Sequence, residues 1–230
     1  LGPTAAVTKI RKYTLDLYKE LEKKVDHSAG LRLNGALSIA QHKGRWQELQ
    51  RQATTAQLYD VDVRILDKDQ IKKNYPIINT DEVIGGILMP GDGAADPSGV
   101  THMLAKAARL EGAQIFEKSP VEEILTKDGK ICGVKVKGQI IECEYIVLAS
   151  GMWSRQIGEK VGVSIPLYPA EHFYIITEPI ENLSKTLPVI RDFDNRTYIN
   201  EDAGKILVGI FEGNSIPAWN KTNRVPENFS

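Results

Sequence analysis

The chain of 230 residues carries 29 Lys and Arg against 30 Asp and Glu, a formal net charge of -1. Its 42% hydrophobic and 26% charged residues are ordinary for a globular protein with a substantial core, in one large domain or two interleaved ones. This composition gives no support to a nucleic-acid partner, and no apolar run approaches the roughly 20 residues that span a membrane.

Hydrophobic periodicity predicts alternating helices and strands over the first ninety residues. The predicted helices cover residues 4–25, 44–59 and 68–74. The predicted strands cover residues 30–40, 61–66 and 83–89. Thr4 and Asp67 are the expected N-caps of the first and third helix, because their side-chain oxygens can accept from backbone N–H groups. The Gly85-Gly86 pair inside the last strand indicates a bulge or a close approach by a ligand or by backbone.

A turn-rich segment, residues 90–97, leads into a predicted helix over residues 98–111. Asp96 or Ser98 can cap this helix, and Pro97 suits its first turn. A short strand is expected over residues 114–116. A three-stranded meander follows, with strands expected over residues 121–125, 131–136 and 139–143, and Asp128-Gly129 is the expected first hairpin turn.

Residues 144–153 form the stretch around which the rest is organised. Tyr145 to Leu148 are apolar and partly β-branched, the pattern of a strand buried on both faces. Ala149, Ser150 and Gly151 follow with little side-chain bulk, and a helix is predicted over residues 154–161. Such a turn lets the backbone approach a flat or phosphorylated ligand at the carboxyl edge of a parallel sheet. Taken alone, the same pattern fits an ordinary tight turn equally well.

After this helix the pattern changes to strands. They are predicted over residues 163–167, 171–177, 189–191, 196–200 and 205–210. Alternation at His172, Tyr174 and Ile176 suggests a sheet with one face over a cavity. The predicted fold class is therefore α/β (α+β), with half of a doubly wound nucleotide-binding domain interleaved with a mostly antiparallel sheet.

The two cysteines, Cys132 and Cys143, fall in neighbouring predicted strands. We expect no disulfide framework and interpret them as buried or half-buried residues, which matches a reducing cytoplasmic compartment, or the mitochondrial matrix in a eukaryote. The chain starts without Met and stops in a run rich in Asn and Pro, so we expect an internal piece of a longer protein.

Several nucleotide-binding and hydrolase motifs are missing from the sequence. It contains no GxGxxG, HExxH, Walker-type or GxSxG pattern. Zinc hydrolysis, NTP hydrolysis and α/β-hydrolase chemistry therefore have no support. The missing GxGxxG also keeps open a different hypothesis, an incomplete and non-catalytic piece that cannot cradle a pyrophosphate by itself.

A set of segments in fixed order resembles a known family. The segments are PGDGAADP at residues 90–97 with the following LAKAAR, SPV at 119–121, IVLASGMW at 146–153, YPAEHFY at 168–174, LPVIRD at 187–192 and RTY at 196–198. Together they resemble the FAD-dependent amine oxidoreductases of the D-amino-acid oxidase superfamily, closest to the dimethylglycine and sarcosine dehydrogenase branch. The resemblance runs from about residue 8 to 225.

The resemblance implies a division into FAD-binding and substrate-binding parts. Residues 1–27 would join the FAD domain, 28–90 and 163–230 would form the substrate domain, and 91–162 would belong to the FAD-binding domain without its glycine-rich loop. The flavin phosphate loop would lie before Leu1. The rest of the flavin site, and a region for tetrahydrofolate in the full-length protein, would lie beyond Ser230.

The same resemblance assigns cofactor contacts to Val121, to the turn Ala149, Ser150 and Gly151, and to Trp153. Val121 matches the position whose backbone meets the FAD adenine. The turn and Trp153 match the family's second cofactor contact. Plain strand or core packing remains the alternative for Val121 and Trp153.

His172 and Tyr198 match the pair that faces the substrate amine in the dimethylglycine branch. Hydride leaves an N-methyl carbon for flavin only when the amine is neutral, and an imidazole or phenol nearby can hold that state. Arg191 could clamp a substrate carboxylate, although an ion pair is the more common role of such a residue. Structural roles remain the alternatives for His172 and Tyr198.

We therefore expect part of a flavoenzyme that oxidises an N-methylated glycine, with a small amine as its substrate. The same fold acting on another amino acid or a 2-hydroxy acid is the alternative. The sequence leaves the electron acceptor open. The other histidines, His27, His42 and His102, are expected to be solvated, and no metal site is expected.

Overall fold

The computed structural model describes residue 2 and residues 4–227. The chain divides into two compact units, each of which is considered by itself. Unit 1 comprises Leu1–Gln114 and His172–Glu212, and unit 2 comprises Ile115–Glu171 and Gly213–Ser230. In the part of the chain that the structure describes, no helix has the length and apolar character needed to cross a membrane.

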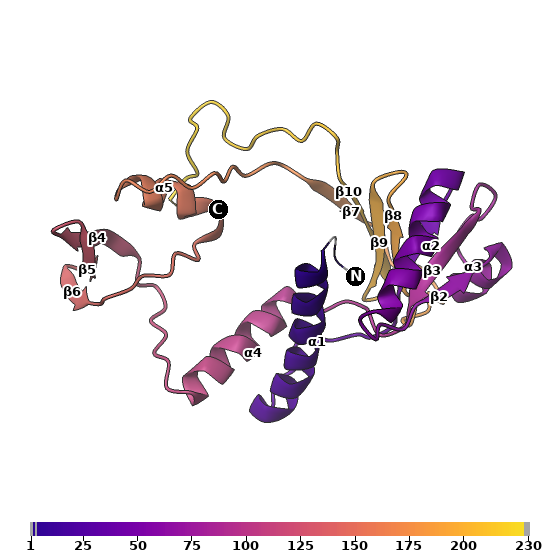
Figure 1. Cartoon of the computed structure of the whole chain (residues 1–230), viewed down its shortest axis with the longest axis horizontal. Coiled ribbons are helices and arrows are strands. Elements are labelled where there is room, and N and C mark those ends of the chain that lie inside the picture. Colours follow the sequence, from indigo (N-terminus) through magenta and orange to yellow (C-terminus); the bar gives the residue numbers. More distant parts are fainter. Residues whose placement is uncertain (1, 3, 228–230) are drawn as a thin grey trace. The chain divides into compact units, whose positions relative to one another are not determined.

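Unit 1 is built on a seven-stranded sheet in the order β2-β3-β1-β8-β9-β10-β7 (Figure 1). Its strands are β1 (Ala36–Ala40), β2 (Arg64–Leu66), β3 (Gly85–Met89), β7 (Phe173–Ile176), β8 (Val189–Asp192), β9 (Thr197–Asp202) and β10 (Lys205–Ile210). Only the central β1·β8 pair of this sheet is parallel, and the other neighbouring pairs are antiparallel. The fold is thus mixed α/β with a large mixed sheet, as predicted.

Two helices cover opposite faces of the sheet at its β2-β3-β1 end. Helix α2 (Lys43–Gln57) packs Trp46 and Leu49 on Ile87, and helix α3 (Lys68–Asn74) packs Ile71 on Leu37 and Leu88. The glycine pair of β3 permits this close packing. A Cβ at Gly85 would meet the Trp46 ring, and one at Gly86 would meet the Ser38 carbonyl. The predicted close approach by backbone is confirmed at Gly86, whereas the group that approaches Gly85 is a side chain. Both faces here are sealed from water.

Helices α1 (Ala5–Val25) and α4 (Pro97–Leu110) pack against each other in unit 1. Their shared core contains Val25, Ala29, Met103 and Ala107. The predicted caps are present: Thr4 accepts from the Val7 N–H, and Asp96 accepts from Gly99 at 2.8 Å. Asp67 and Gln70 form a reciprocal capping box at α3.

A partly buried ion pair ties the segment before β1 to β9. The Arg32 guanidinium lies 2.7 Å from the carboxylate of Glu201, whose side chain is 1% exposed. Arg32 also donates to the Glu201 carbonyl, and the Gly204 N–H donates to the other carboxylate oxygen. Burial, together with the nearby Glu201 charge, raises the pKa of Tyr75 to about 12.

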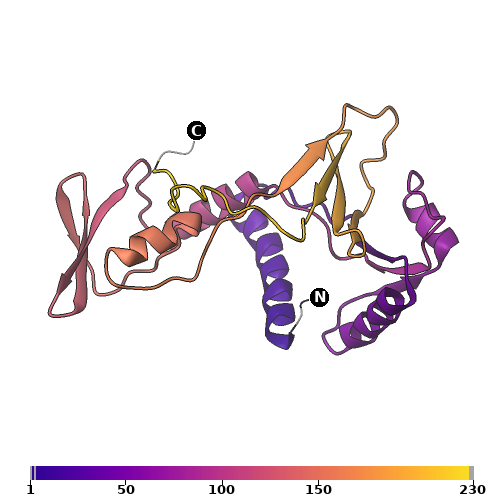
Figure 2. The same cartoon turned by 90° about the horizontal axis from the view of Figure 1, so that it is seen from above.

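Unit 2 contains a small antiparallel sheet in the order β4-β5-β6 (Figure 2). Its strands are β4 (Val121–Lys127), β5 (Lys130–Val136) and β6 (Gln139–Glu142). The predicted meander is therefore confirmed, with the hairpin turn at Asp128 and Gly129, both of which have positive φ. The 3-10 helix η1 (Gly151–Trp153) and the short helix α5 (Ser154–Glu159) follow.

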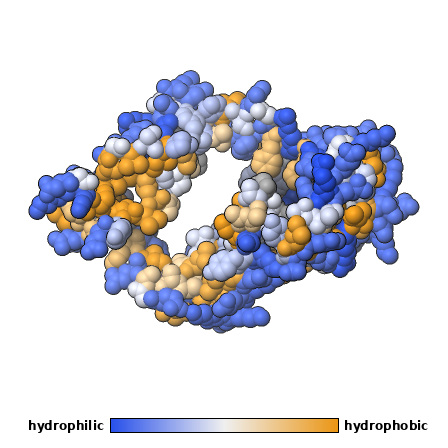
Figure 3. All heavy atoms as spheres, in the orientation of Figure 1, coloured by the Kyte–Doolittle hydropathy of each residue, from blue (hydrophilic) through white to orange (hydrophobic). Residues whose placement is uncertain are grey.

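Residues 145–148 do not form the predicted buried strand. They have no regular secondary structure, and Tyr145 and Val147 are 86% and 89% exposed. A strand needs neighbours to accept and donate its backbone hydrogen bonds, and no described residue pairs with this run. Hydrophobic residues consequently gather on the surface of unit 2, in the part of Figure 3 that holds β4–β6.

Three smaller expectations also differ from the structure. Residues 114–116 and 163–167 contain no strand. Cys132 is exposed rather than buried or half-buried, whereas Cys143 is intermediate. The strand interpretation was wrong for the same reason in each segment: short apolar runs satisfy a strand pattern without specifying a partner strand.

Candidate active site

The predicted substrate residues Arg191 and Tyr198 lie on the same face of the large sheet as helix α2. That helix covers only the β2-β3-β1 end of this face. The strand register sets Ile87, Ser38, Arg191, Tyr198, Gly209 and Tyr174 directly opposite one another in one row. Residues opposed in this way project from the same face. Ile87 is fully buried beneath α2, whereas Tyr174 is 60% exposed. The β9-β10-β7 end of this face is therefore open.

An aromatic cluster brings His172 and Tyr198 into contact with the same residue, Phe211. The Phe211 ring centroid lies 5.7 Å from that of His172 and 5.3 Å from that of Tyr198. The sequence pattern did not identify Phe211, which follows β10 and lies two residues beyond Gly209. The two predicted substrate residues, 26 positions apart in the sequence, thus share one cluster because β9 and β7 both pair with β10.

Glu212 is the second functional candidate that sequence reasoning missed. Its carboxylate oxygen lies 2.8 Å from the His172 Nδ1. A hydrogen bond from the Glu212 backbone N–H, and then one from His172, hold the pKa of the Glu212 carboxyl below its ordinary value. An ionised carboxylate can only accept, so the hydrogen lies on Nδ1, and a neutral ring then carries its lone pair on Nε2.

Gly209 makes room for the Tyr198 side chain. The two residues are opposed in the β9·β10 register, and a Cβ at Gly209 would overlap the Tyr198 ring, including its hydroxyl. The ring therefore lies directly over the β10 backbone. The only sequence signal was a glycine within an apolar strand, which indicates a close approach without saying by what.

Arg191 is engaged by a carboxylate of the protein itself. Its guanidinium lies 3.4 Å from Asp92, and both side chains are about one-third exposed, at 34% and 36%. This contact matches the ion-pair alternative for Arg191. A partly exposed pair of this length is weak, so a competing carboxylate could displace Asp92.

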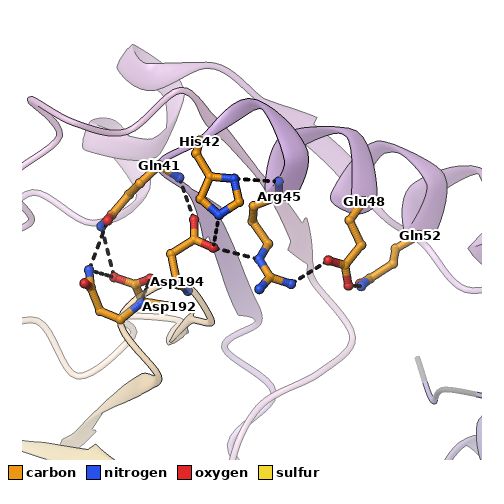
Figure 4. Close-up of polar contacts among 8 residues, drawn as sticks. Gln41, His42, Arg45, Glu48, Gln52, Asp192 and Asp194 are labelled. Atoms are coloured by element: carbon orange, nitrogen blue, oxygen red, sulfur yellow. Dashed lines mark hydrogen bonds and ion pairs between the residues drawn. The ribbon is translucent and has the colours of Figure 1, made fainter.

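A polar network fixes the hairpin between β8 and β9 against the start of α2 (Figure 4). Asp192 accepts from Gln41 and Asn195, and Asp194 accepts from the Gln41 N–H and the Arg45 side chain. Burial acts to raise the pKa of Asp194, but the hydrogen bonds from Gln41 and Arg45 outweigh it, and the pKa is lowered. The hairpin that carries Arg191 and Tyr198 is thereby held in place.

His42 belongs to this network as well. Its Nδ1 accepts from the Arg45 N–H at 3.2 Å, which caps α2, and its Nε2 lies 3.1 Å from Asp194. The side chain is 64% exposed, as expected of a solvated histidine, but its two contacts were not predicted from the sequence. A neutral ring with its hydrogen on Nε2 satisfies both.

The predicted cofactor residues all lie in unit 2. Val121 begins β4 and is 49% exposed, and Gly151 begins η1 with φ of 53°. A Cβ at Gly151 would meet no atom within 4 Å, so open space adjoins the backbone of the small-residue turn. The exposed apolar run before the turn is likewise available to a flat ligand, so these residues fit a flavin contact.

Trp153 has a contact of its own within unit 2. The indole Nε1 donates to the Pro226 carbonyl at 2.7 Å, and the neighbouring Arg155 and Gln156 bond residues 223 and 225. This contact fits the packing alternative for Trp153 and fixes residues 223–226 against α5. The hydrogen bond uses only the indole Nε1 and does not involve the face of the ring.

The chain matches one family model and several curated proteins. The family model is described as "DAO: FAD dependent oxidoreductase" and matches residues 1–228. The 4-methylaminobutanoate oxidase (formaldehyde-forming) of Paenarthrobacter nicotinovorans is 36% identical over 93% of this chain and 26% of its own length. The mouse pyruvate dehydrogenase phosphatase regulatory subunit is 33% identical over 92% of this chain and 24% of its own. Human mitochondrial sarcosine dehydrogenase is 32% identical over 86% of this chain and 22% of its own.

A solved structure has the same fold. The L-proline dehydrogenase from P. horikoshii superposes with a TM-score of 0.80 and 26% identity, over 91% of this chain and 56% of that one. The chain thus spans about a quarter of the length of these curated relatives and about half of this structural one.

Proposed function

Because this chain belongs to the DAO family of FAD dependent oxidoreductases, we propose that it forms part of an enzyme that oxidises an N-methylated amino acid. Dimethylglycine and sarcosine are the substrates we favour. The observation that carries the proposal is the His172–Glu212 pair beside Phe211 and Tyr198, on the open face of the large sheet. Relatives named for oxidation of a methylaminobutanoate and of sarcosine support the substrate class.

In this proposal His172 takes the proton from the substrate ammonium. Glu212 holds the hydrogen of the neutral ring on Nδ1, so Nε2 is the acceptor. The ionised carboxylate then stabilises the imidazolium that forms. Removal of this proton frees the nitrogen lone pair, which is the electronic condition for breaking a C–H bond of the N-methyl carbon.

Tyr198 and Arg191 orient the substrate. The Tyr198 hydroxyl, held over the β10 backbone, can hydrogen-bond the amine, and the Phe211 ring beside it offers an apolar contact for the methyl group. Arg191, one strand away in the same row, would exchange its weak contact with Asp92 for a two-pronged contact with the substrate carboxylate.

The cofactor in this proposal is FAD, which accepts the hydride when bound. Val121, the turn Ala149, Ser150 and Gly151, and Trp153 would contact it. We keep tetrahydrofolate as a prediction for the full-length protein, as the acceptor of the one-carbon product. The electron acceptor is left open, and the reducing compartment (cytoplasm or mitochondrial matrix) is also kept as a prediction.

The test is flavin reduction followed by stopped flow in the natural full-length protein. Candidate substrates are dimethylglycine, sarcosine, proline and 2-hydroxyglutarate. We expect the first two to bleach the flavin, and His172→Ala to slow the bleaching on the order of a hundredfold. The matched control is His102→Ala, which removes a histidine from α4 and should leave the rate unchanged. Equal rates for the His172→Ala variant and the parent would refute the role of His172.

Two alternatives remain and have their own outcomes in this test. Bleaching by proline or 2-hydroxyglutarate alone would support the same fold with another substrate, and the structural relative named as an L-proline dehydrogenase makes this a real alternative. A non-catalytic role is favoured by the relative named as a phosphatase regulatory subunit. Full-length protein that purifies without flavin and does not take it up would support that role.

A further inference from the structure

The two cysteines of unit 2 face each other across two strands. The β5·β6 register pairs Gly133 with Glu142, so the next pair outward is Cys132 with Cys143. The Cys143 N–H donates to the Cys132 carbonyl at 3.2 Å, which marks this as a hydrogen-bonded pair. Directly opposed residues project from the same face of a sheet. The two thiols therefore lie on one face of β5 and β6.

The spacing of such a pair falls within reach of a disulfide. The Cα atoms of a hydrogen-bonded antiparallel pair lie about 5.5 Å apart, and disulfides span Cα distances of about 4.4–6.8 Å. The Cβ atoms of a hydrogen-bonded pair lie about 5.5 Å apart, which is longer than the roughly 3.5–4.5 Å of a disulfide, so closing the bond must draw the two strands together by about 1 Å. Cys143 lies just after the last residue of β6, where the backbone can yield most easily.

The exposure of the thiols and the strain expected in a disulfide between them favour a reversible disulfide over a structural one. Cys132 is exposed and Cys143 is intermediate, so a small oxidant can reach at least the first thiol. A disulfide that departs from ideal geometry is more easily reduced, and exposed, strained disulfides are the labile ones.

We propose that Cys132 and Cys143 form a reversible dithiol–disulfide site that a peroxide closes. One thiol is oxidised by hydrogen peroxide to a sulfenic acid with release of one water. The second thiol attacks that sulfur, the S–S bond forms, the S–O bond breaks and a second water leaves. Two thiols lose two hydrogens and two electrons, and the peroxide gains them. The closed site would tie the start of residues 144–151 to β5, and it does not depend on the proposed amine oxidation.

The test is peptide mapping of the natural full-length protein before and after treatment with hydrogen peroxide. Free thiols are alkylated, and the protein is digested with trypsin without reduction. Cleavage after Lys130, Lys135, Lys137 and Arg155 places the cysteines in different peptides, residues 131–135 and 138–155. We expect these two peptides to be recovered as one disulfide-linked species. Treatment of the folded, oxidised protein with dithiothreitol before alkylation should abolish this species.

Matched variants separate this geometry from chance contact. Cys132→Ser and Cys143→Ser should each abolish the linked species. Glu142→Cys in the Cys143→Ser background moves the thiol by one residue and thus to the opposite face of the sheet. It should also lose the linked species, although the tryptic peptides keep the same bounds. Equal linkage in this variant would overturn the proposal. So would recovery of Cys132 as a sulfinic or sulfonic acid beside an unmodified Cys143.

Discussion

One row of aliphatic side chains crosses the large sheet from a buried end to an exposed one. In register from β1 to β7, the row runs through Leu37, Ile190, Ile199, Val208 and Ile175. Leu37 is fully buried and Ile190 is 1% exposed, whereas Ile175 at the other end is 67% exposed. The chemical character of the row hardly changes, but its surroundings do.

The difference arises from what covers each end. Helices α2 and α3 close the two faces over β1 and β3, and all five residues of each of these strands are buried. All four residues of β7 are exposed, and no helix of unit 1 packs on it in the described residues. The covered end supplies the folding energy. The open end supplies the accessible surface on which His172, Tyr198 and Phe211 gather.

The largest effect should come from the buried end. Leu37→Ala removes a fully buried side chain packed against Ile71 and Ile190, and helix α3, which covers this face, cannot collapse fully into the space. We expect the free energy of unfolding to fall by about 2–5 kcal/mol. Urea denaturation of the parent and the variant measures it, and a loss below about 1 kcal/mol would show that this end is not the sealed core described above.

At the open end a comparable effect should appear in activity. Gly209→Ala adds a Cβ where the Tyr198 ring lies, so the ring must move while the backbone keeps its strand conformation. A misplaced contact group can cost on the order of a hundredfold in kcat/KM. Steady-state kinetics of the full-length enzyme measures it.

A double-mutant cycle supplies the control for Gly209. In a Tyr198→Ala background the ring is gone, so Gly209→Ala should change kcat/KM little further. Additive losses would mean that Gly209 acts through something other than Tyr198.

The sequence predicted local features of this fold better than distant pairings. Thr4 and Asp67 were predicted as caps, and Asp96 was one of two candidates for a third, because a cap depends on residues within one turn of helix. The central β1·β8 pair joins residues about 150 positions apart, and no local pattern specifies it. Residues 145–148 illustrate the limit: an apolar run predicts burial, but the partner that would bury it is not encoded in the run.

The candidate site shows the same division. His172 and Tyr198 came from a resemblance, and the sheet register brings them together around Phe211. Glu212 and Gly209 could not be predicted from the sequence. Glu212 matters through its contact with His172, and Gly209 matters through the close approach of Tyr198. An isolated glutamate or glycine carries no such signal.

A smaller effect is expected where the two ends meet, at the hairpin network of Asp194. Since the pKa of Asp194 is lowered in the fold, its contribution to stability is complete above the ordinary carboxyl pKa and is lost as the pH falls through the lowered value. Asp194→Asn should reduce stability by about 1 kcal/mol at neutral pH and flatten the pH dependence below about pH 4. Unfolding free energies from pH 2 to 7, roughly the range over which carboxyl groups titrate, would reveal this, and an unchanged acid slope would contradict it.

The smallest effect belongs to the exposed end of the same row. Ile175→Ala truncates a side chain that is already 67% exposed, so the free energy of unfolding should change by no more than about 0.5 kcal/mol. The comparison with Leu37→Ala is sharp, because both substitutions truncate an aliphatic residue on one face of one sheet. A loss at Ile175 as large as at Leu37, measured in the full-length protein but not in this chain alone, would show that another part of the protein covers β7. Because Ile175 and Tyr198 belong to neighbouring register rows and so project from opposite faces of the sheet, such a cover would leave the face that carries His172 and Tyr198 accessible.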